Sequence, residues 1–201
     1  MAVLIPALRP RSGRSLASAA RWACALLFAA LLSGPSLRAA PSSREYQVKA
    51  VFLFNFAQFV EWPPAAFPDP SAPLVIGVLG TDPFGPALDE VVRGESVGGR
   101  ALAIRRYQSP EEIDSCHILF LGNSVASQLD DVLSRLQNRA VLTVSDLDGS
   151  VRRGVMIRFL TEKNRVRLRI NLEAARTAGL TISSKLLRPA EVVGNTGEAT
   201  P

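Results

Sequence analysis

The chain has 201 residues, of which 23 are basic and 18 acidic, and its formal net charge is +5 at pH 7. The first 39 residues hold five arginines and no acidic residue, so the remainder has 18 basic and 18 acidic side chains. This balanced remainder lacks the excess positive charge that nucleic-acid binding requires, and we predict no nucleic-acid role.

Residues 1–39 have the pattern of a signal peptide that is removed on export. Arginines come first, an almost wholly apolar run follows over 22–32, and Gly34 and Pro35 then break the helix. The run is about half the roughly 20 residues needed to cross a bilayer, so it is too short for a permanent anchor. We therefore predict an exported protein, cleaved near Ala39 or Ala40, with no stable membrane insertion.

After this segment, the sequence predicts a long helix followed by alternating strands and helices. Residues 43–61 are typical of a mostly buried helix whose polar positions share one face; these are Gln47, Lys49, Asn55 and Gln58. Short apolar runs predict strands at 74–79, 101–107, 117–121 and 141–144. Helical segments at 83–92 and 124–136 separate several of these strands, which indicates a parallel sheet covered on both faces.

The pattern changes to an antiparallel hairpin after residue 150. Residues 155–160 and 165–171 flank a turn, and the second run alternates strictly between arginine and aliphatic residues. Such alternation predicts a hairpin with one face in water. A short helix at 172–178 and a last helical piece that begins after Ser183 complete the predicted elements.

Together these elements predict an α/β fold. We expect a three-layer sandwich whose mainly parallel sheet is extended by a C-terminal antiparallel hairpin. Residues 40–193 would form a single domain, because about 160 residues are enough to bury a core without metal or disulfide support. Residues 194–201 are predicted to be a disordered tail.

Polar residues follow three of the predicted parallel strands. They are Thr81 and Asp82, Asn123 and Ser124, and Ser145 and Asp146. The carboxyl ends of parallel strands meet at one edge of a sheet, where open α/β sheets commonly bind ligands. A small-ligand cleft is therefore one hypothesis. Ordinary capped turns are the alternative, because the nearby glycines match neither the dinucleotide nor the P-loop spacing.

Basic residues gather between positions 152 and 169, where Glu162 is the single acidic residue. They are Arg152, Arg153, Arg158, Lys163, Arg165, Arg167 and Arg169. A charged face protects a hairpin from pairing edge to edge with other chains. The same charges would also suit docking of an acidic partner surface, acting mainly on association rate and orientation. The candidate partner-binding residues are Arg158, Arg165, Arg167 and Arg169.

The sequence offers no residues equipped for catalysis, and we predict a protein that is not an enzyme and has no cofactor and no metal. His117 is the single histidine, without a cluster that could complete a zinc site, and we interpret it as structural. Asp146 and Asp148 open an acidic loop that lacks the later calcium ligands, which favours a polar turn. Cys116 is the only cysteine after residue 39, so we expect a buried small hydrophobe and no intrachain disulfide.

Four phenylalanines make the helix at 43–61 apolar over most of its circumference. They are Phe52, Phe54, Phe56 and Phe59. A single sheet face would not cover all of this apolar surface. Two interpretations stay open: the cluster belongs to the core only, or it also forms a contact with a second copy or a partner.

Four segments in this order, YQVKAVFLFNFAQFVEWP, GVLGTDPFG, CHILFLG and RLRINLEAARTAGLTISSKLL, resemble the YfiR family of periplasmic proteins. The resemblance covers most of residues 46–193. It implies a periplasmic α/β domain, commonly dimeric, whose best-known member represses an inner-membrane diguanylate cyclase by binding its periplasmic part. That member has disulfide-forming cysteines linked to control of its activity, whereas this chain keeps only Cys116, so redox switching by a disulfide is in doubt.

The leading prediction is a periplasmic regulator that represses or modulates an inner-membrane diguanylate cyclase or a sensor kinase, and thereby cyclic-di-GMP signalling. Its partners would be that membrane protein and a second copy in a homodimer. The alternative is a periplasmic small-molecule sensor whose ligand lies at the carboxyl ends of the strands.

Overall fold

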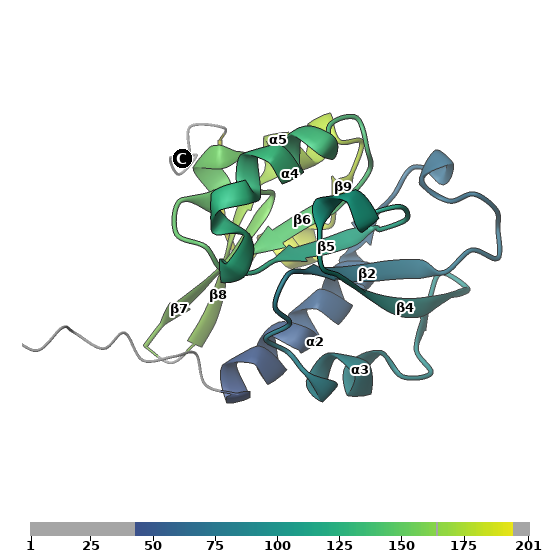
Figure 1. Ribbon diagram of the computed structural model, residues 1–201, viewed down its shortest axis with the longest axis horizontal. Helices are drawn as coiled ribbons and strands as arrows, with labels where there is room; N and C mark the ends of the chain where they lie inside the picture. The colour runs from purple at the N-terminus through teal and green to yellow at the C-terminus, as the bar shows by residue number, and fades with distance from the viewer. Residues whose placement is uncertain (1–42, 164, 195–201) are drawn as a thin grey trace, which may run out of the picture. The chain divides into compact units, whose positions relative to one another are not determined.

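The computed structural model describes residues 43–163 and 165–194 (Figure 1). The predicted signal peptide and all but the first residue of the predicted tail lie outside the described residues. An eight-stranded mixed sheet has the order β10-β8-β7-β6-β5-β2-β4-β3. Its strands are β2 (Leu74–Leu79), β3 (Ser96–Val97), β4 (Arg100–Tyr107), β5 (Ile118–Leu121), β6 (Leu142–Ser145), β7 (Ile157–Glu162), β8 (Arg165–Asn171) and β10 (Glu191–Val193).

The centre of the sheet is parallel, and its two antiparallel pairings involve the β7–β8 hairpin and the short edge strand β3. Strands β4, β2, β5, β6 and β7 pair in parallel, whereas β7 and β8 run antiparallel. A separate two-stranded sheet joins β1 (Val60–Glu61) to β9 (Thr181–Ile182). The predicted α/β fold with a parallel sheet and a C-terminal hairpin is therefore confirmed.

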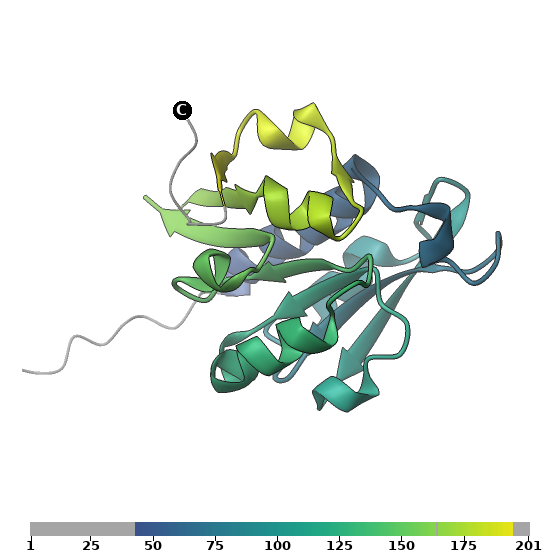
Figure 2. The same ribbon diagram turned by 90° about the horizontal axis from the view of Figure 1, so that it is seen from above.

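Helices cover the sheet from both faces. The α-helices are α2 (Ser43–Phe59), α3 (Pro86–Val92), α4 (Leu129–Arg135), α5 (Leu172–Thr177) and α6 (Ser184–Leu187), and the 3-10 turns are η1 (Pro64–Ala66), η2 (Pro110–Glu112), η3 (Asn123–Gln128) and η4 (Ser150–Arg153). Figure 1 shows α2 and α3 on one side of the sheet and α4 on the other. Figure 2, seen from above, shows α5 and α6 near the hairpin end of the sheet, apart from α4.

Two hydrophobic clusters fill the space on the two faces of the sheet. Leu53 and Phe56 of α2 pack in the first cluster with Phe159 of β7. Leu129 and Val132 of α4 belong to the second cluster, on the opposite face. Strands β2 and β5 are buried along their whole length, because both of their faces are covered, and this explains why they are apolar without alternation.

Several element boundaries differ from the sequence-based predictions. The helix predicted at 83–92 is α3, which begins at Pro86 and not at Pro83. The Asp82 carboxylate accepts a hydrogen bond from the Phe84 amide, which forms a local turn before the helix. The predicted helix at 124–136 is split into η3 and α4. The prediction that Lys49 lies on a polar face was wrong, since Lys49 is 2% exposed.

Candidate functional site

The four candidate arginines lie on one face of the β7–β8 hairpin. Arg158 of β7 is directly opposite Arg169 of β8, and alternation places Arg165 and Arg167 on the same face. The intervening residues turn to the other face, where Leu168 is buried in the core beneath α2. The sequence alternation therefore corresponds to an arginine face made by Arg158, Arg165, Arg167 and Arg169. Partner binding by this arginine face stays a prediction.

Carboxylates from other parts of the chain reduce the charge of the arginine face. Arg158 pairs with Asp148, which precedes η4. Arg169 places Nη2 2.8 Å from Glu191 Oε2, on the neighbouring strand β10. Counting acidic residues only between positions 152 and 169 therefore overestimated the net positive charge. The outer end of the face keeps more of its charge, because the Arg167 side chain is 58% exposed and its carboxylate contact is a long 3.5 Å.

A small hollow lies at the inner end of the arginine face. Its volume is about 170 Å³, and its lining residues are Asp148, Gly149, Val151, Arg152, Arg158 and Arg169. The Arg158 side chain is only 13% exposed. Its Nε is buried and has no hydrogen-bond partner among the described residues. Arg158 therefore borders the hollow with a largely buried guanidinium whose Nε is enclosed by the protein.

The polar residues at the strand ends lie at one edge of the sheet, as the parallel pairing requires. The Thr81 amide donates to Ser124 Oγ at 2.9 Å, which ties β2 to the turn after β5. Ser145 Oγ donates to the Leu121 carbonyl at 2.7 Å and accepts from the Leu147 amide. These polar groups satisfy one another, and Asn123 beside them is exposed. Ligand binding at this edge stays a prediction.

Two aspartates at this edge face other elements. Asp82 Oδ2 lies 2.7 Å from Arg106 Nε, and the same guanidinium holds Asp89 of α3 at 2.6 Å. Arg106, on β4, thus fixes the β2–α3 turn. Asp146 instead faces α2. The sequence placed the six polar residues at one sheet edge, but it did not reveal these long-range partners.

Asp146 is part of a buried charged cluster with the first turns of α2. Its Oδ2 accepts a hydrogen bond from Tyr46 Oη at 2.7 Å and lies 2.9 Å from Lys49 Nζ. Lys49 Nζ also contacts Glu45 Oε1 at 2.7 Å and lies 4.5 Å from the centre of the Tyr46 ring. Burial and the adjacent Asp146 carboxylate raise the pKa of Tyr46 well above its ordinary value of 10. The cluster attaches α2 to the end of β6.

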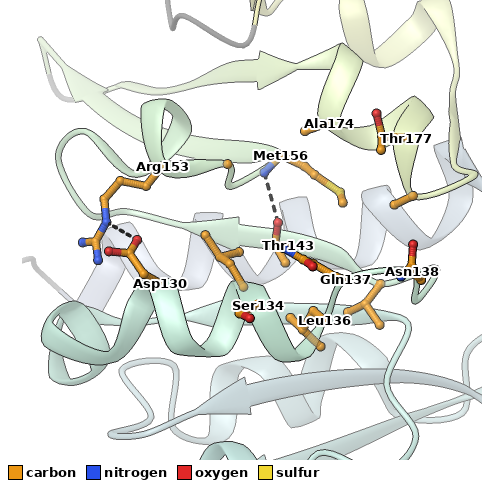
Figure 3. A pocket seen from close by; sticks show the side chains of 14 residues that line it. Asp130, Ser134, Leu136, Gln137, Asn138, Thr143, Arg153, Met156, Ala174 and Thr177 are labelled. Atoms are coloured by element: carbon orange, nitrogen blue, oxygen red, sulfur yellow. Dashed lines mark hydrogen bonds and ion pairs between the residues drawn. The ribbon is translucent and has the colours of Figure 1, made fainter.

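A larger cavity of about 520 Å³ lies between α4, α5 and the start of β7. Figure 3 shows α4 forming one wall, with Thr177 of α5 opposite. Leu133, Leu136, Val141 and Met156 supply apolar lining. An ion pair of 2.8 Å between Arg153 and Asp130 lies at one end (Figure 3). Sequence reasoning missed this cavity, because its lining comes from segments without a shared motif.

The family comparison agrees with this architecture. The model of the YfiR/HmsC-like family matches residues 46–191, from the start of α2 to the start of β10. The chain belongs to the YfiR/HmsC-like family. No curated protein matches the chain.

In this YfiR/HmsC-like protein, the cysteine and the histidine are structural parts of the core. Cys116 is buried, and burial raises the pKa of its thiol to about 12. His117 is 1% exposed; its Nδ1 accepts from the Val75 amide at 3.0 Å, and its ring stacks on Phe67. Among the described residues, no group of three histidine, cysteine or acidic side chains could hold a metal ion.

The YfiR/HmsC-like domain also has an unusual distribution of apolar surface on α2. Phe56 is fully buried, whereas Phe52, Phe54 and Phe59 are half-buried. Val48 and Val51 are 42% and 45% exposed. Phe52, Phe56 and Phe59 thus pack in or against the core, Phe54 is half-buried outside it, and the most exposed apolar side chains of α2 are the two valines. Within residues 43–163 and 165–194, no helix is long and apolar enough to span a membrane.

Proposed function

We propose that this protein is a periplasmic regulator that represses or modulates an inner-membrane diguanylate cyclase or a sensor kinase by binding its periplasmic part. Membership of the YfiR/HmsC-like family supports a regulatory role. The observation that carries the docking proposal is the arginine face of the hairpin, which the core-facing residues behind it hold in place.

The outer end of the arginine face suits reversible docking. Strand β10 pairs with β8 only over residues 169–171, so residues 165–168 form a sheet edge without a neighbouring strand among the described residues. Arg165 and Arg167 are exposed along this edge. Cations at an edge prevent random strand pairing, and they also attract an acidic partner and orient its approach. Binding at such a rim should be sensitive to salt.

The proposal is tested by capture of membrane partners from detergent-solubilised inner membranes at low and moderate salt. Wild-type protein should retain a cyclase or sensor kinase, more strongly at low salt. The double variant R165E/R167E should lose most of this capture, whereas R135E, at an exposed position of α4, should keep it. Equal capture by the wild type and R165E/R167E would refute docking through the arginine face.

A deletion strain tests the regulatory role separately. Loss of the gene should change cyclic-di-GMP or kinase output under conditions in which the protein is expressed, and the wild-type gene should restore it. The R165E/R167E gene should fail to restore it while producing normal protein levels. Unchanged output in the deletion strain would contradict regulation of either enzyme class.

The cavity between α4 and α5 favours a second candidate function, sensing of a small molecule. Its volume of about 520 Å³ falls within the roughly 300–1,000 Å³ of typical small-molecule sites. Apolar lining beside Thr177 and Gln137 would suit a ligand with an apolar body and a polar end. A thermal-shift screen of metabolites tests this function; a hit should be lost in Met156→Trp, which fills the cavity, and kept in R165E/R167E.

Homodimer formation is a further part of the proposal. Val48 and Val51 expose apolar surface on α2, and a second copy of the chain would bury this surface in a homodimer. A dimer would also present two arginine faces to a partner, which would strengthen attachment to a dimeric membrane protein.

A further inference from the structure

The outer part of β8 has main-chain groups that face away from its partner strand β7. The Asn171 amide donates to the Met156 carbonyl at 2.8 Å, so residue 171 directs its main-chain groups toward the β7 side. In an antiparallel pair these groups point alternately to the two sides of a strand, which directs the N–H and C=O of Val166 away from β7. Strand β10 covers that other side only along residues 169–171. Val166 therefore lies at an edge that no strand among the described residues pairs, which we call the Val166 edge.

A hollow of about 270 Å³ lies along the Val166 edge. It is lined by Phe52, Arg165, Val166, Arg167, Leu168 and Pro189. The two faces of the sheet contribute different chemistry to it. On the α2 side, Phe52 and Val166 are half-buried and pack against the core. On the opposite side, Arg165 and Arg167 are exposed. The hollow is thus apolar on one side of the strand and positively charged on the other.

An extended segment of a partner fits this combination. A strand added to a sheet edge gains main-chain hydrogen bonds, and its alternate side chains enter the surfaces on either face. The side chain opposite Val166 would lie on the apolar side, beside Phe52. The residues before and after it would lie beside Arg165 and Arg167, where opposite charges are favourable. The edge therefore selects an acidic, an apolar and an acidic residue in succession.

Two other occupants fit the Val166 edge less well. A second copy that paired through the same edge would bring its own Arg165 and Arg167 against those of the first, and like charges on neighbouring strands are destabilising. The chain's own continuation after β10 leads in the wrong direction, because β10 runs parallel to β8 from residue 169 to residue 171 and so away from Val166. Charge complementarity thus favours an acidic segment of another protein.

We propose that the Val166 edge binds an extended segment of the docking partner in which an apolar residue stands between two acidic residues. This binding mode rests on the proposed function, because the segment belongs to the partner that the arginine face attracts. Arg165 and Arg167 pair with the two carboxylates, and the main chain of Val166 fixes the register of the added strand.

NMR titration of ¹⁵N-labelled exported protein with synthetic peptides tests the sequence pattern. The peptide Thr-Thr-Glu-Val-Glu-Thr-Thr should shift the Val166 amide signal saturably at constant ionic strength. The peptide Thr-Thr-Glu-Glu-Val-Thr-Thr has the same composition and charge but should bind several-fold more weakly. When its valine faces Phe52, only one of its glutamates can lie beside an arginine. R165E/R167E should reverse the charge preference and bind the Lys-Val-Lys analogue better than the Glu-Val-Glu peptide.

Methylated peptides test the main-chain hydrogen bonds. In an antiparallel arrangement the valine N–H of the peptide bonds Val166, whereas in a parallel arrangement the N–H of the second glutamate does so. One of the two singly methylated peptides should therefore bind at least about tenfold more weakly, because it has lost that donor, and the other should bind like the parent peptide. Val166→Pro removes the donor of the protein and should also bind weakly. It should still fold, because an edge position whose N–H faces outward tolerates proline.

Three results would overturn the strand pairing. The first is an unshifted Val166 amide in the presence of the Glu-Val-Glu peptide, and the second is parent-like binding by both methylated peptides. The third is a homodimer that Val166→Pro dissociates, which would show that a second copy occupies the edge. In each case, capture of the membrane partner by R165E/R167E would still decide the proposed function separately.

Discussion

Lys49 offers the sharpest test of how the tertiary structure holds a charge in the core. Its side chain is 3% exposed and contacts Asp146, which is 8% exposed, at 2.9 Å. Replacement by methionine keeps most of the apolar stem and removes the ammonium group. Asp146 then keeps the Tyr46 hydroxyl as a donor but loses its counter-ion in a buried position. Removing one partner of a buried ion pair typically costs about 3–5 kcal/mol.

The expected loss for Lys49→Met is therefore about 3–5 kcal/mol of unfolding free energy, a large share of the roughly 5–15 kcal/mol typical of a native domain. At about 2–4 °C per kcal/mol for a chain of this size, the melting temperature should fall by roughly 6–20 °C. Urea unfolding followed by far-UV circular dichroism measures the free energy directly. If the slope of unfolding free energy against urea concentration is the same as in the wild type, the substitution has changed the stability and not the compactness of the folded or unfolded state.

A double-mutant cycle separates the ion pair from other effects of the substitution. Asp146→Asn keeps an acceptor for Tyr46 and removes the charge, so Lys49→Met combined with Asp146→Asn should recover about 2 kcal/mol relative to additivity. Arg135→Met is the surface control, because that side chain is 47% exposed and should cost less than about 1 kcal/mol. Additive single effects, or a Lys49→Met cost as small as that of Arg135→Met, would refute the reasoning.

Other predictions follow from the core and from α2. Burial lowers the pKa of His117 below 6.5, so the unfolded chain binds the proton more readily. The free energy of unfolding should therefore be highest above about pH 6.5 and should decrease at lower pH, by at most about 1.4 kcal/mol per pH unit. The urea midpoint should change less with pH in His117→Gln than in the wild type. The raised pKa of about 12 and burial of Cys116 should protect it from Ellman's reagent at about pH 8 until denaturant is added, and rapid labelling of the native protein would contradict this placement. Gly77→Ala would place a methyl carbon 2.7 Å from the Cys116 sulfur and should lower the unfolding free energy by about 1–3 kcal/mol, whereas Gly122→Ala, with its nearest contact at 3.5 Å, should cost less in the same assay. Val51→Glu should convert a homodimer to a monomer in light scattering, and an unchanged dimer mass would exclude this face of α2 as the contact.

The sequence determined the features that depend on a short repeat or on a local hydrogen bond. Alternation of arginine and aliphatic residues over 165–171 predicted the exposed and buried faces of β8, because successive side chains of a strand point to opposite faces. The helix that follows β8 was predicted to end at residue 178, and the next residue, Gly179, has the positive φ of 75° that favours glycine. Ser183 was predicted to cap the last helix, and its hydroxyl does accept from the Lys185 amide. Repeated apolar runs also predicted the parallel centre of the sheet.

Only the tertiary structure decided which distant side chains meet. Lys49 and Asp146 are 97 positions apart. Helical spacing places Lys49 on the same face as the buried Leu53 and Phe56, but it does not show which distant carboxylate neutralises the ammonium group there. Glu191 reaches Arg169 because β10 returns to pair with β8, and this pairing sets the charge of the hollow beside Arg158. Strand alternation and helix capping act over a few residues and leave a periodic signal, whereas ion pairs and cavities depend on how the crossovers stack whole elements, a property that no local pattern contains.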